Sequence, residues 1–286
     1  MGSFSVLNNI SGINAQNQLN INNVSLNRTL LRLSSGKRIN SGADDAAGLG
    51  IADSLRANVR AIDQAVRNAN DGISVAQIAD GALQEITNLL TRAFTLAEEA
   101  ATGTVDANGR AALGGEYTAI QAEIARIAAQ TNFNGVSLLV PGAGVDGTLS
   151  VFVGDVSIAS TITVTIASIT TSGDTVTDLG GVDLTTVDLS DATTAASALA
   201  TLQSALTAVS SSRAAIGAGM NRLQSAVAVL QTTSQNTQAA ESTIRDANMA
   251  EEIANLTKYQ ILAQSGIAAL SQANSNSQLV LALLRQ

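Results

Sequence analysis

The sequence contains no cysteine and no histidine, and it holds one proline, Pro141, in 286 residues. Disulfides, thiol chemistry, histidine-based metal sites and Ser-His-Asp or Cys-His catalysis are therefore excluded. Because proline breaks helices more strongly than any other residue, its scarcity permits long uninterrupted helices. These absences favour an architectural protein over an enzyme, and we predict no catalytic, cofactor-binding or metal-binding residue.

Aromatic residues make up 2% of the chain, although 45% of it is hydrophobic. The apolar residues are therefore Ala, Leu, Ile and Val, which suit helices packed at close range. The net charge is −8, and residues 127–212 contain no Lys, Arg or Glu, so Asp alone carries charge there. Because no basic patch with interleaved aromatic residues is present, we expect no nucleic-acid binding.

Both ends of the chain are long and uncharged, over residues 1–27 and 259–284. The first segment has no cationic stretch and is rich in Asn and Gln, and amides such as Gln264 and Gln272 interrupt the second. Buried amides would be costly in lipid. We therefore predict neither a cleaved Sec-type signal peptide nor a segment inserted in a membrane.

Apolar residues repeat at alternating spacings of three and four, which is typical of coiled-coil packing. Near the C-terminus they are Ile253, Leu256, Ala263, Ile267, Leu270, Leu281 and Leu284, and upstream of them Ile216, Met220, Leu223, Val227 and Leu230. In the N-terminal half they are Leu55, Val59, Ile62, Val66, Ala69, Ile73 and Ala76, and after a shift Leu83, Ile86, Leu90, Ala93 and Ala97. A compact helical bundle is the alternative, but a helix from Asp44 to Ala101 would be roughly 85 Å long, too long for a compact domain.

The middle of the chain has a different pattern, in which apolar and hydroxyl residues alternate. This period of two with β-branched side chains predicts strands at Leu149–Val153 and within Ile158–Ile169, with a turn near Gly154–Ser157. Gly173-Asp174 and Gly180-Gly181 predict further turns. The fold class is therefore mainly α, a long helical coiled-coil rod formed by the two halves of the chain, with a small β-hairpin region in the middle.

Two features of the middle have alternative interpretations. Residues 142–147 match the pattern GxGxxG, but Pro141 precedes them and no helix pattern follows, so a flexible loop is favoured over a dinucleotide site. The hydroxyl-rich stretch either carries O-linked glycans or is simply strand-forming sequence, and the second interpretation is slightly favoured.

Several motifs of the chain resemble those of bacterial flagellin. They are Leu33–Ser41 (LSSGKRINS), Asp44–Leu49 (DDAAGL), Thr131–Val136 (TNFNGV), Gln260–Gln264 (QILAQ) and Val280–Arg285 (VLALLR). The resemblance covers roughly residues 1–140 and 205–286, with both ends in the order expected of the family. Since only about 65 residues separate the matching halves, the chain resembles a short flagellin that lacks large outer domains.

The resemblance implies three regions and a function. Residues 1–43 and 249–286 would form an inner domain of paired terminal helices, residues 44–140 and 205–248 a helical rod, and residues 141–204 a β-hairpin and connection at the tip of the rod. The chain would be a structural subunit that self-assembles into the flagellar filament used for motility, here a smooth and thin one. A hook–filament junction protein of the same axial family is the alternative, and a secreted adhesin or enzyme on the same scaffold is disfavoured.

Self-association would depend on apolar side chains of the terminal helices, which are marginal alone and would fold on meeting neighbouring subunits. The predicted self-association residues are Ile10, Ile13, Val24, Leu31, Leu256, Ile267, Leu270, Leu281 and Leu284. The turn at residues 34–42 would be a hinge that sets filament shape, with Gly36, Asn40 and Gly42 as its key residues. An ordinary helix break is the alternative interpretation of the same residues.

The resemblance also implies partners and a location. An innate immune receptor could recognise a patch of Arg92, Leu96 and Glu123, although Phe94 and Thr95 replace residues usual in the family, and packing between subunits is favoured for this surface. The other expected partners are further copies of the chain, the flagellar cap and junction proteins, the type III flagellar export apparatus and a cytoplasmic export chaperone at the C-terminal helix. The expected location is extracellular, in the flagellar filament, after export without a cleaved signal peptide.

Overall fold

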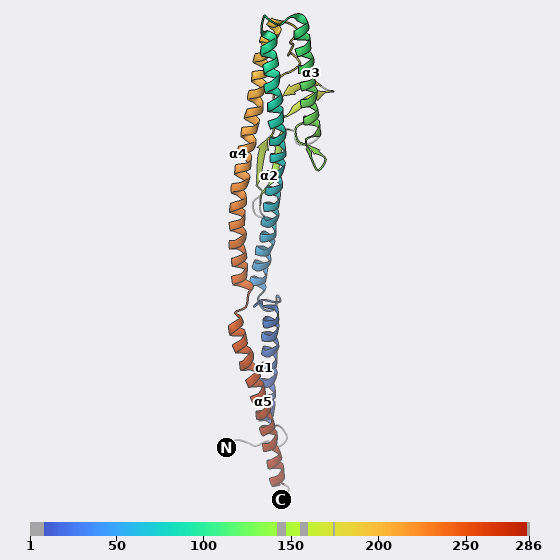
Figure 1. Ribbon diagram of the computed structural model, residues 1–286. Coiled ribbons are helices and arrows are strands. Elements are labelled where there is room, and N and C mark those ends of the chain that lie inside the picture. Colours follow the sequence, from blue (N-terminus) through green and yellow to red (C-terminus); the bar gives the residue numbers. More distant parts are fainter. Residues whose placement is uncertain (1–8, 142–146, 155–159, 174, 285–286) are drawn as a thin grey trace. The chain divides into compact units, whose positions relative to one another are not determined.

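The computed structural model describes residues 9–141, 147–154, 160–173 and 175–284, with side chains up to residue 276. Its helices are α1 (Ile10–Ser35), α2 (Ala46–Ala101), α3 (Ala107–Gln130), α4 (Ala192–Arg245) and α5 (Met249–Leu284) (Figure 1). Its strands are β1 (Asn132–Phe133), β2 (Val136–Ser137), β3 (Thr148–Phe152), β4 (Thr161–Thr165), β5 (Ile169–Ser172) and β6 (Thr175–Leu179). The predicted fold class, mainly α with a small β-hairpin region in the middle, is confirmed.

The chain divides into two compact units, with borders between Ala57 and Asn58 and between Gln235 and Asn236. Unit 1 holds α1, α5 and the adjoining ends of α2 and α4, and unit 2 holds the remainder. These borders lie inside α2 and α4, whereas the predicted borders between the inner domain and the rod, at residues 43/44 and 248/249, lie at the breaks between helices. The ends of α2 and α4 belong to unit 1 because they contact the turn after α1. Arg38 N–H, for example, donates a hydrogen bond to the carbonyl of Arg245 at 2.7 Å.

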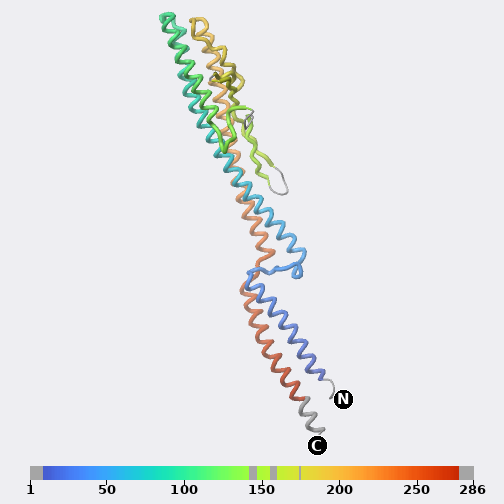
Figure 2. The backbone as a smooth tube through the Cα atoms, turned by 90° about the vertical axis from the view of Figure 1, so that its right-hand side faces the viewer, coloured from blue at the N-terminus to red at the C-terminus, as the bar shows by residue number. Residues whose placement is uncertain are grey.

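In unit 2, α2, α3 and α4 run alongside one another (Figures 1 and 2), and the core forms between their apolar faces. Many of the side chains buried between them are small, and they include Ala69, Ala76, Ala79, Ala93, Ala97, Ala195, Ala198 and Ala205. Of the predicted apolar repeats, Leu83, Ile86 and Leu90 are buried on α2, and Ile216 and Leu223 on α4. Close packing of small side chains thus replaces the aromatic core that the composition excludes.

The strands in the described part of unit 2 form three antiparallel pairs, β1–β2, β3–β4 and β5–β6. Strand β3 pairs with β4 over five residues, from Thr148 opposite Thr165 to Phe152 opposite Thr161, which confirms the alternation seen in the sequence. The turn predicted near Gly154–Ser157 and the loop predicted at residues 142–147 lie largely outside the described residues. Gly180 and Gly181, with φ of 63° and 93°, form the turn predicted after β6.

A short hairpin, β1–β2, was not predicted. Asn134 and Gly135 connect its strands, and both have positive φ, 52° and 80°. A two-residue loop with these angles matches the twist of a hairpin, and Asn-Gly is the sequence that adopts it most readily. The signal was therefore present in the sequence, within the TNFNGV motif.

Two helical glycines bring the β3–β4 hairpin close to the helices. A Cβ at Gly72 of α2 would lie 2.6 Å from Cγ2 of Val151, and a Cβ at Gly219 of α4 would lie 2.7 Å from Cγ2 of Val164. Both valines are buried. The hairpin therefore packs directly on the backbones of α2 and α4, where a larger residue would not fit.

This packing predicts opposite effects for two glycines of α4. Gly219→Ala should lower the free energy of unfolding by about 1–3 kcal/mol, because the new methyl group overlaps Val164. Gly217→Ala should raise it by about 0.5–1 kcal/mol, since a Cβ there meets nothing within 4 Å and alanine favours the helix. Urea unfolding followed by circular dichroism measures both, and equal effects at the two positions would contradict this packing.

Candidate self-association surface

Helix α1 is held against α5 through a heptad stripe in which leucines alternate with small and polar residues. This inner stripe is buried or half-buried and consists of Gly12, Ala15, Leu19, Asn22, Leu26, Thr29 and Leu33. The two helices run antiparallel, and a Cβ at Gly266 of α5 would lie 3.3 Å from Cδ1 of Leu19. The pair thus approaches closely, and three of the seven α1 residues at the contact are large apolar side chains.

The isoleucines and the valine of α1, together with Leu31, form a second stripe that faces away from α5. This outer stripe is exposed throughout and consists of Ile10, Ile13, Asn17, Ile21, Val24, Arg28 and Leu31. Its five apolar members are 52% to 63% exposed. The predicted self-association residues of α1, namely Ile10, Ile13, Val24 and Leu31, all belong to it.

The geometry of the helix explains why α5 cannot cover both stripes. Successive residues are about 100° apart around an α-helix, so a position two residues from the inner stripe lies roughly 160° around the helix from it. Ile10 stands in this relation to Gly12, as Ile13 does to Ala15. The partner that buries the inner stripe therefore leaves the outer stripe in solvent.

The apolar residues of α5 are divided between two faces. Its inner stripe consists of Glu252, Leu256, Tyr259, Ala263, Gly266, Leu270 and Ala273, all buried or half-buried. The predicted repeat is thus correct at Leu256 and Leu270 but differs by one residue at Ile253 and Ile267, which are more than half exposed. The side chains of Leu281 and Leu284 lie outside the described part of the chain, so their predicted role in self-association is not tested.

Unit 1 accordingly exposes far more large apolar side chains than unit 2. Of the seventeen such exposed side chains among the described residues, twelve belong to unit 1, although it is the smaller unit. A hollow of about 400 Å³ continues the outer stripe between Val24, Leu31 and the turn at Asn40–Asp44. Exposed apolar surface of this extent marks an association site.

Polar contacts fix the antiparallel pair at both ends. The Asn9 side chain accepts a hydrogen bond from Gly12 N–H and caps α1, while its amide donates to the carbonyl of Ala273 and to Asn274 Oδ1. At the other end, Arg32 donates to Glu252, which is 8% exposed, at 3.4 Å. The sequence patterns did not indicate the contacts of Asn9 with α5 or of Arg32 with Glu252, because these contacts join residues more than 200 positions apart.

The predicted hinge, residues 34–42, is bonded to the break between α4 and α5. Gly36 ends α1 with φ of 70°, and its carbonyl accepts a hydrogen bond from Ala247 N–H at 3.0 Å. Lys37 forms a β-bridge with Asp246, and the Arg38 guanidinium donates to the carbonyl of Ile244. The turn after α1 and the break between α4 and α5 are therefore joined by hydrogen bonds. Glycine is required at position 36 because its φ is positive.

Side chains also close this turn onto α1 and α2. The Asn40 amide donates to Ser35 Oγ at 2.8 Å and to the carbonyl of Leu31, and the Asp45 carboxylate caps α2 by accepting from Gly48 N–H. Gly42 is exposed, has no positive φ and, if given a Cβ, would meet only the far end of a leucine side chain at 3.9 Å. Of the three predicted hinge residues, Gly36 and Asn40 thus make specific contacts, and the hinge function itself stays a prediction.

Asp44 is the titratable group on which the turn depends. Its Oδ2 accepts hydrogen bonds from the backbone amides of Asn40 and Ser41 and from the Ser41 hydroxyl, at 3.2 to 3.3 Å. Burial acts to raise the pKa of Asp44, but the two amides, the hydroxyl and the nearby charge of Arg32 together lower it below its usual value. The ionised carboxylate is therefore the form that holds the turn.

The residues predicted for immune-receptor recognition do not form one exposed patch. Leu96 is fully buried in the core of unit 2, so its placement on the surface was wrong: it lies three residues after the buried Ala93, on the core-facing side of α2. Arg92 pairs with Glu116 of α3 at 2.7 Å, and Glu123 accepts from Arg126 Nε at 2.7 Å. Both exposed members are thus engaged in ion pairs, and recognition by a receptor stays untested.

Among the described residues, no three acidic side chains gather closely enough to hold a metal ion. No helix in the described part of the chain combines the length and the mean hydropathy needed to cross a membrane.

Comparison with known proteins gives matches at both ends and along nearly the whole chain. Residues 6–141 match the bacterial flagellin N-terminal helical region, and residues 199–284 match the bacterial flagellin C-terminal helical region. Flagellin FlaB1 of Treponema pallidum is 36% identical, covering 97% of this chain and 98% of its own length. The flagellar filament 30.7 kDa core protein of Treponema maltophilum is 37% identical over 96% and 98%, and flagellin of Halalkalibacterium halodurans is 39% identical over 97% and 98%.

The lowered pKa of Asp44 predicts acid sensitivity of the turn. A carboxyl whose pKa is lower in the folded than in the unfolded chain stabilises the fold fully above its unfolded pKa, here 3.8, and loses this effect as pH falls through the folded value. The difference in Tm between the unsubstituted chain and Asp44→Asn should therefore be largest near neutral pH, should shrink as pH falls below 3.8, and should vanish only below the lower folded pKa.

Differential scanning calorimetry between pH 7 and pH 2.5 measures this difference. Ser41→Ala serves as the comparison, because it keeps the carboxylate and removes one of its three hydrogen-bond donors. It should show a smaller effect with the same direction of pH dependence. A Tm difference for Asp44→Asn that is independent of pH would contradict the assignment.

Proposed function

The chain belongs to the bacterial flagellin family, and we propose that its copies are held together in the filament through the outer stripe of α1 and the exposed side of α5. The chain is a structural subunit of the flagellar filament, in keeping with relatives that are named filament core proteins. Those names favour the filament subunit over the hook–filament junction protein. The single observation that carries the assembly mechanism is the exposed apolar stripe that lies opposite the helix partner within the same chain.

The proposed mechanism couples stabilisation of the terminal helices to assembly. Alone, the α1–α5 pair is a single pair of helices whose inner stripes hold five leucines and a tyrosine, the other positions being glycine, alanine or polar, so its stability is limited. Burying a large apolar side chain that is half exposed in the monomer contributes about 1 kcal/mol or more. The five apolar residues of the outer stripe together supply several kcal/mol per subunit when neighbours cover them. The pair is therefore marginal in the monomer and ordered in the filament.

Polar members of the outer stripe give the contact its register. Asn17 and Arg28 interrupt the apolar positions, and Arg28 lies 3.9 Å from Asp44 across the hollow beside Leu31. A polar residue at a helix interface is satisfied in one alignment and left unpaired in shifted ones. Neighbouring copies are thus directed to one axial position, which a polymer with a regular helical repeat requires.

The proposed contact joins two different surfaces of the subunit, so it does not produce a closed dimer. The outer stripe of one copy meets a surface of another copy that is not its own equivalent, so each added subunit presents the same stripe again. Repeated heterologous contacts of this kind generate an open helical polymer. The turn at Gly36 and Asn40, bonded to the break between α4 and α5, is the proposed hinge that adjusts unit 1 to its neighbours.

The middle of the chain supports the proposal of a smooth and thin filament. The segment between the two family matches, residues 142–198, contains β3 to β6 and the start of α4. Its buried side chains, among them Val164, Ile169 and Leu179, belong to the same core as α2 and α3. The described part of this segment thus packs on the helices of unit 2 and does not form a separate outer domain.

The remaining partners and the location are proposed from family membership. The subunit is exported by the type III flagellar apparatus, a cytoplasmic chaperone covers α5 before export, and cap and junction proteins flank the filament outside the cell. The exposed apolar side chains of α5, Ile253, Ile261 and Ile267, support the need for a chaperone, since such a surface associates non-specifically when it is free.

Matched substitutions on α1 test the assembly surface. Ile13→Asp and Val24→Asp place a charge in the outer stripe and should slow elongation from filament seeds at least about tenfold, because a buried unpaired carboxylate costs more than 1.4 kcal/mol. Asn14→Asp and Asn23→Asp add the same charge one residue away and should elongate within about threefold of the unsubstituted chain. Light scattering and negative-stain electron microscopy of the full-length proteins measure elongation.

Circular dichroism of the monomers provides the control for folding. All four variants should retain the helix content and the unfolding transition of unit 2, since every substituted side chain is exposed in the single chain. Equal loss of elongation in both pairs would show that charge alone matters and would contradict the stripe. Normal elongation of Ile13→Asp and Val24→Asp would contradict the proposed surface itself.

A further inference from the structure

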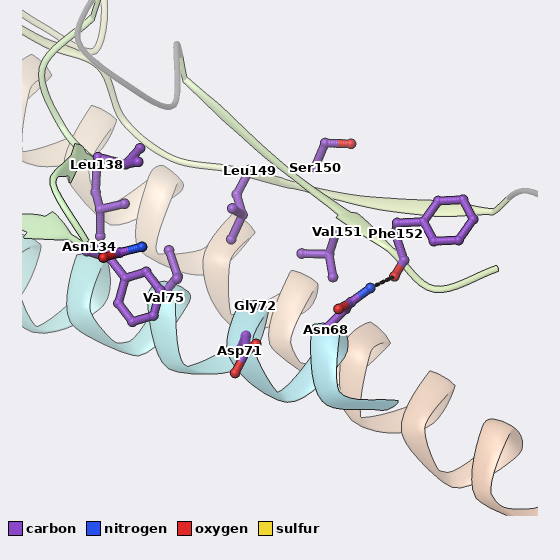
Figure 3. Close-up of a pocket in the computed structure, with 12 residues that line it drawn as sticks. Asn68, Asp71, Gly72, Val75, Asn134, Leu138, Leu149, Ser150, Val151 and Phe152 are labelled. Carbon is purple, nitrogen blue, oxygen red and sulfur yellow. Dashed lines mark hydrogen bonds between the residues drawn. The ribbon is translucent and has the colours of Figure 1, made fainter. Parts of the chain in front are cut away.

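A second apolar feature lies in unit 2, where α2, the β1–β2 hairpin and β3 enclose a groove of about 360 Å³ (Figure 3). Its floor is formed by Val75, Leu138 and Val151, which are buried. Phe133 and Phe152 stand at its edge and are 39% and 46% exposed. Two exposed phenylalanines are notable in a chain that has four in total.

The walls of the groove are held in place by contacts within unit 2. Val151 packs on the backbone of α2 at Gly72, and Asn68 Nδ2 donates to the carbonyl of Phe152 at 3.2 Å, as the dashed line in Figure 3 shows. The groove is therefore present in the single subunit and does not need a partner to open it. A preformed apolar groove of this size accepts one or two aliphatic side chains.

The charge at the groove has one sign. Asp71 lies on its edge and is exposed, and within the described part of the chain its carboxylate makes no hydrogen bond or ion pair. The other polar lining residues, Asn68, Asn134 and Ser150, are uncharged. The chemistry that fits is an aliphatic side chain with a cation close by on the same element.

Helix α4 presents that combination on its outward side. Val229 is 65% exposed, the highest value among the exposed large apolar side chains described. Arg222, seven residues earlier, is exposed, and its guanidinium has no carboxylate partner within 4 Å among the described residues. Residues seven apart share one face of a helix and are about 10 Å apart along it.

The dimensions and shape of the two surfaces agree. The groove follows α2 from Asn68 to Val75, which is also seven residues and therefore about 10 Å. Ser225 lies between Arg222 and Val229 on the same face of α4, and this small side chain lets the helix approach the groove closely. Within one copy, this face of α4 is directed away from the core that Leu223 and Val227 contact.

We propose that the groove of one subunit binds the Arg222–Val229 face of α4 from a second copy of the chain, with Val229 in the groove and Arg222 paired with Asp71. This contact rests on the proposed function and adds a second interface to it, formed by unit 2. Groove and helix face are different surfaces, so the contact is heterologous and propagates without closing. Charge complementarity between Asp71 and Arg222 sets its direction.

Cross-linking between single-cysteine variants tests the contact directly, because the natural chain has no cysteine. Asp71→Cys and Arg222→Cys proteins are mixed in equal amounts, polymerised from seeds and treated with a short bis-maleimide. A cross-linked dimer should appear in the mixture and not in either variant alone. Glu98→Cys, another exposed acid of α2, replaces Asp71→Cys in the control mixture and should give no dimer.

The outcomes separate this contact from the proposed function. Failure of the unsubstituted chain to polymerise overturns the proposed function and this contact with it. Filaments that form normally but give no dimer in the Asp71→Cys and Arg222→Cys mixture overturn this contact alone. Equal cross-linking in the Glu98→Cys control overturns it as well, since it would show that cross-linking does not depend on the docked geometry.

Elongation rates of charge and core variants provide a second, independent test. Asp71→Arg should slow elongation about tenfold, and adding Arg222→Asp in the same chain should restore it to within about threefold. Val229→Asp should also slow it about tenfold, whereas Ala228→Asp, one residue away and exposed, should not. If Asp71→Arg slows elongation and Val229→Asp does not, the groove binds something other than this face of α4, and the proposal is overturned.

Discussion

The structure depends on a constraint at α1, whose two stripes cannot be covered by one partner because they lie roughly 160° apart around the helix. Within the chain, α5 covers the stripe in which leucines alternate with small and polar residues. The isoleucines, valine and leucine of the other stripe stay exposed. A subunit of this kind reaches its most favourable state only beside other copies, so the sequence of α1 encodes assembly as much as folding.

Unit 2 follows the opposite principle. Its helices carry alanine and glycine where they meet and use leucine and isoleucine to fill the remaining space, so the core closes without help from another chain. The β3–β4 hairpin packs on Gly72 and Gly219 and completes that core. The two units thus differ in how they are stabilised. Unit 2 buries enough apolar area to be stable alone, whereas unit 1 leaves apolar area exposed that neighbouring copies bury. Outside unit 1, exposed apolar surface gathers at the groove beside Phe133 and Phe152 and at Val229.

The spacing of apolar residues predicts the helices well because each repeat is local. The seven-residue period of α2 and α4 identifies Leu83, Leu90 and Leu223 as core residues, and their burial confirms it. The same period does not predict burial correctly at Ile253 and Ile267. Two apolar stripes overlap on α5, and the sequence does not indicate which of them α1 covers. Contacts between distant residues, such as Asn9 with Ala273 or Arg38 with Arg245, leave no pattern in the local sequence, so only the folded structure reveals them. Leu96 shows the converse, since a motif match placed it on a surface although it is fully buried, three residues after Ala93 of the core-facing repeat.

Hydrogen exchange of the full-length chain, measured by mass spectrometry on monomers and on filaments, tests the central claim most directly. If assembly stabilises the α1–α5 pair, peptides from α1 and α5 should exchange rapidly in the monomer and become strongly protected in the filament. Peptides from the core of unit 2, such as those around Leu83 to Leu90, should be protected in both states. Equal protection of α1 in monomer and filament would contradict the account, because it would mean that the pair is already stable and gains nothing from its neighbours.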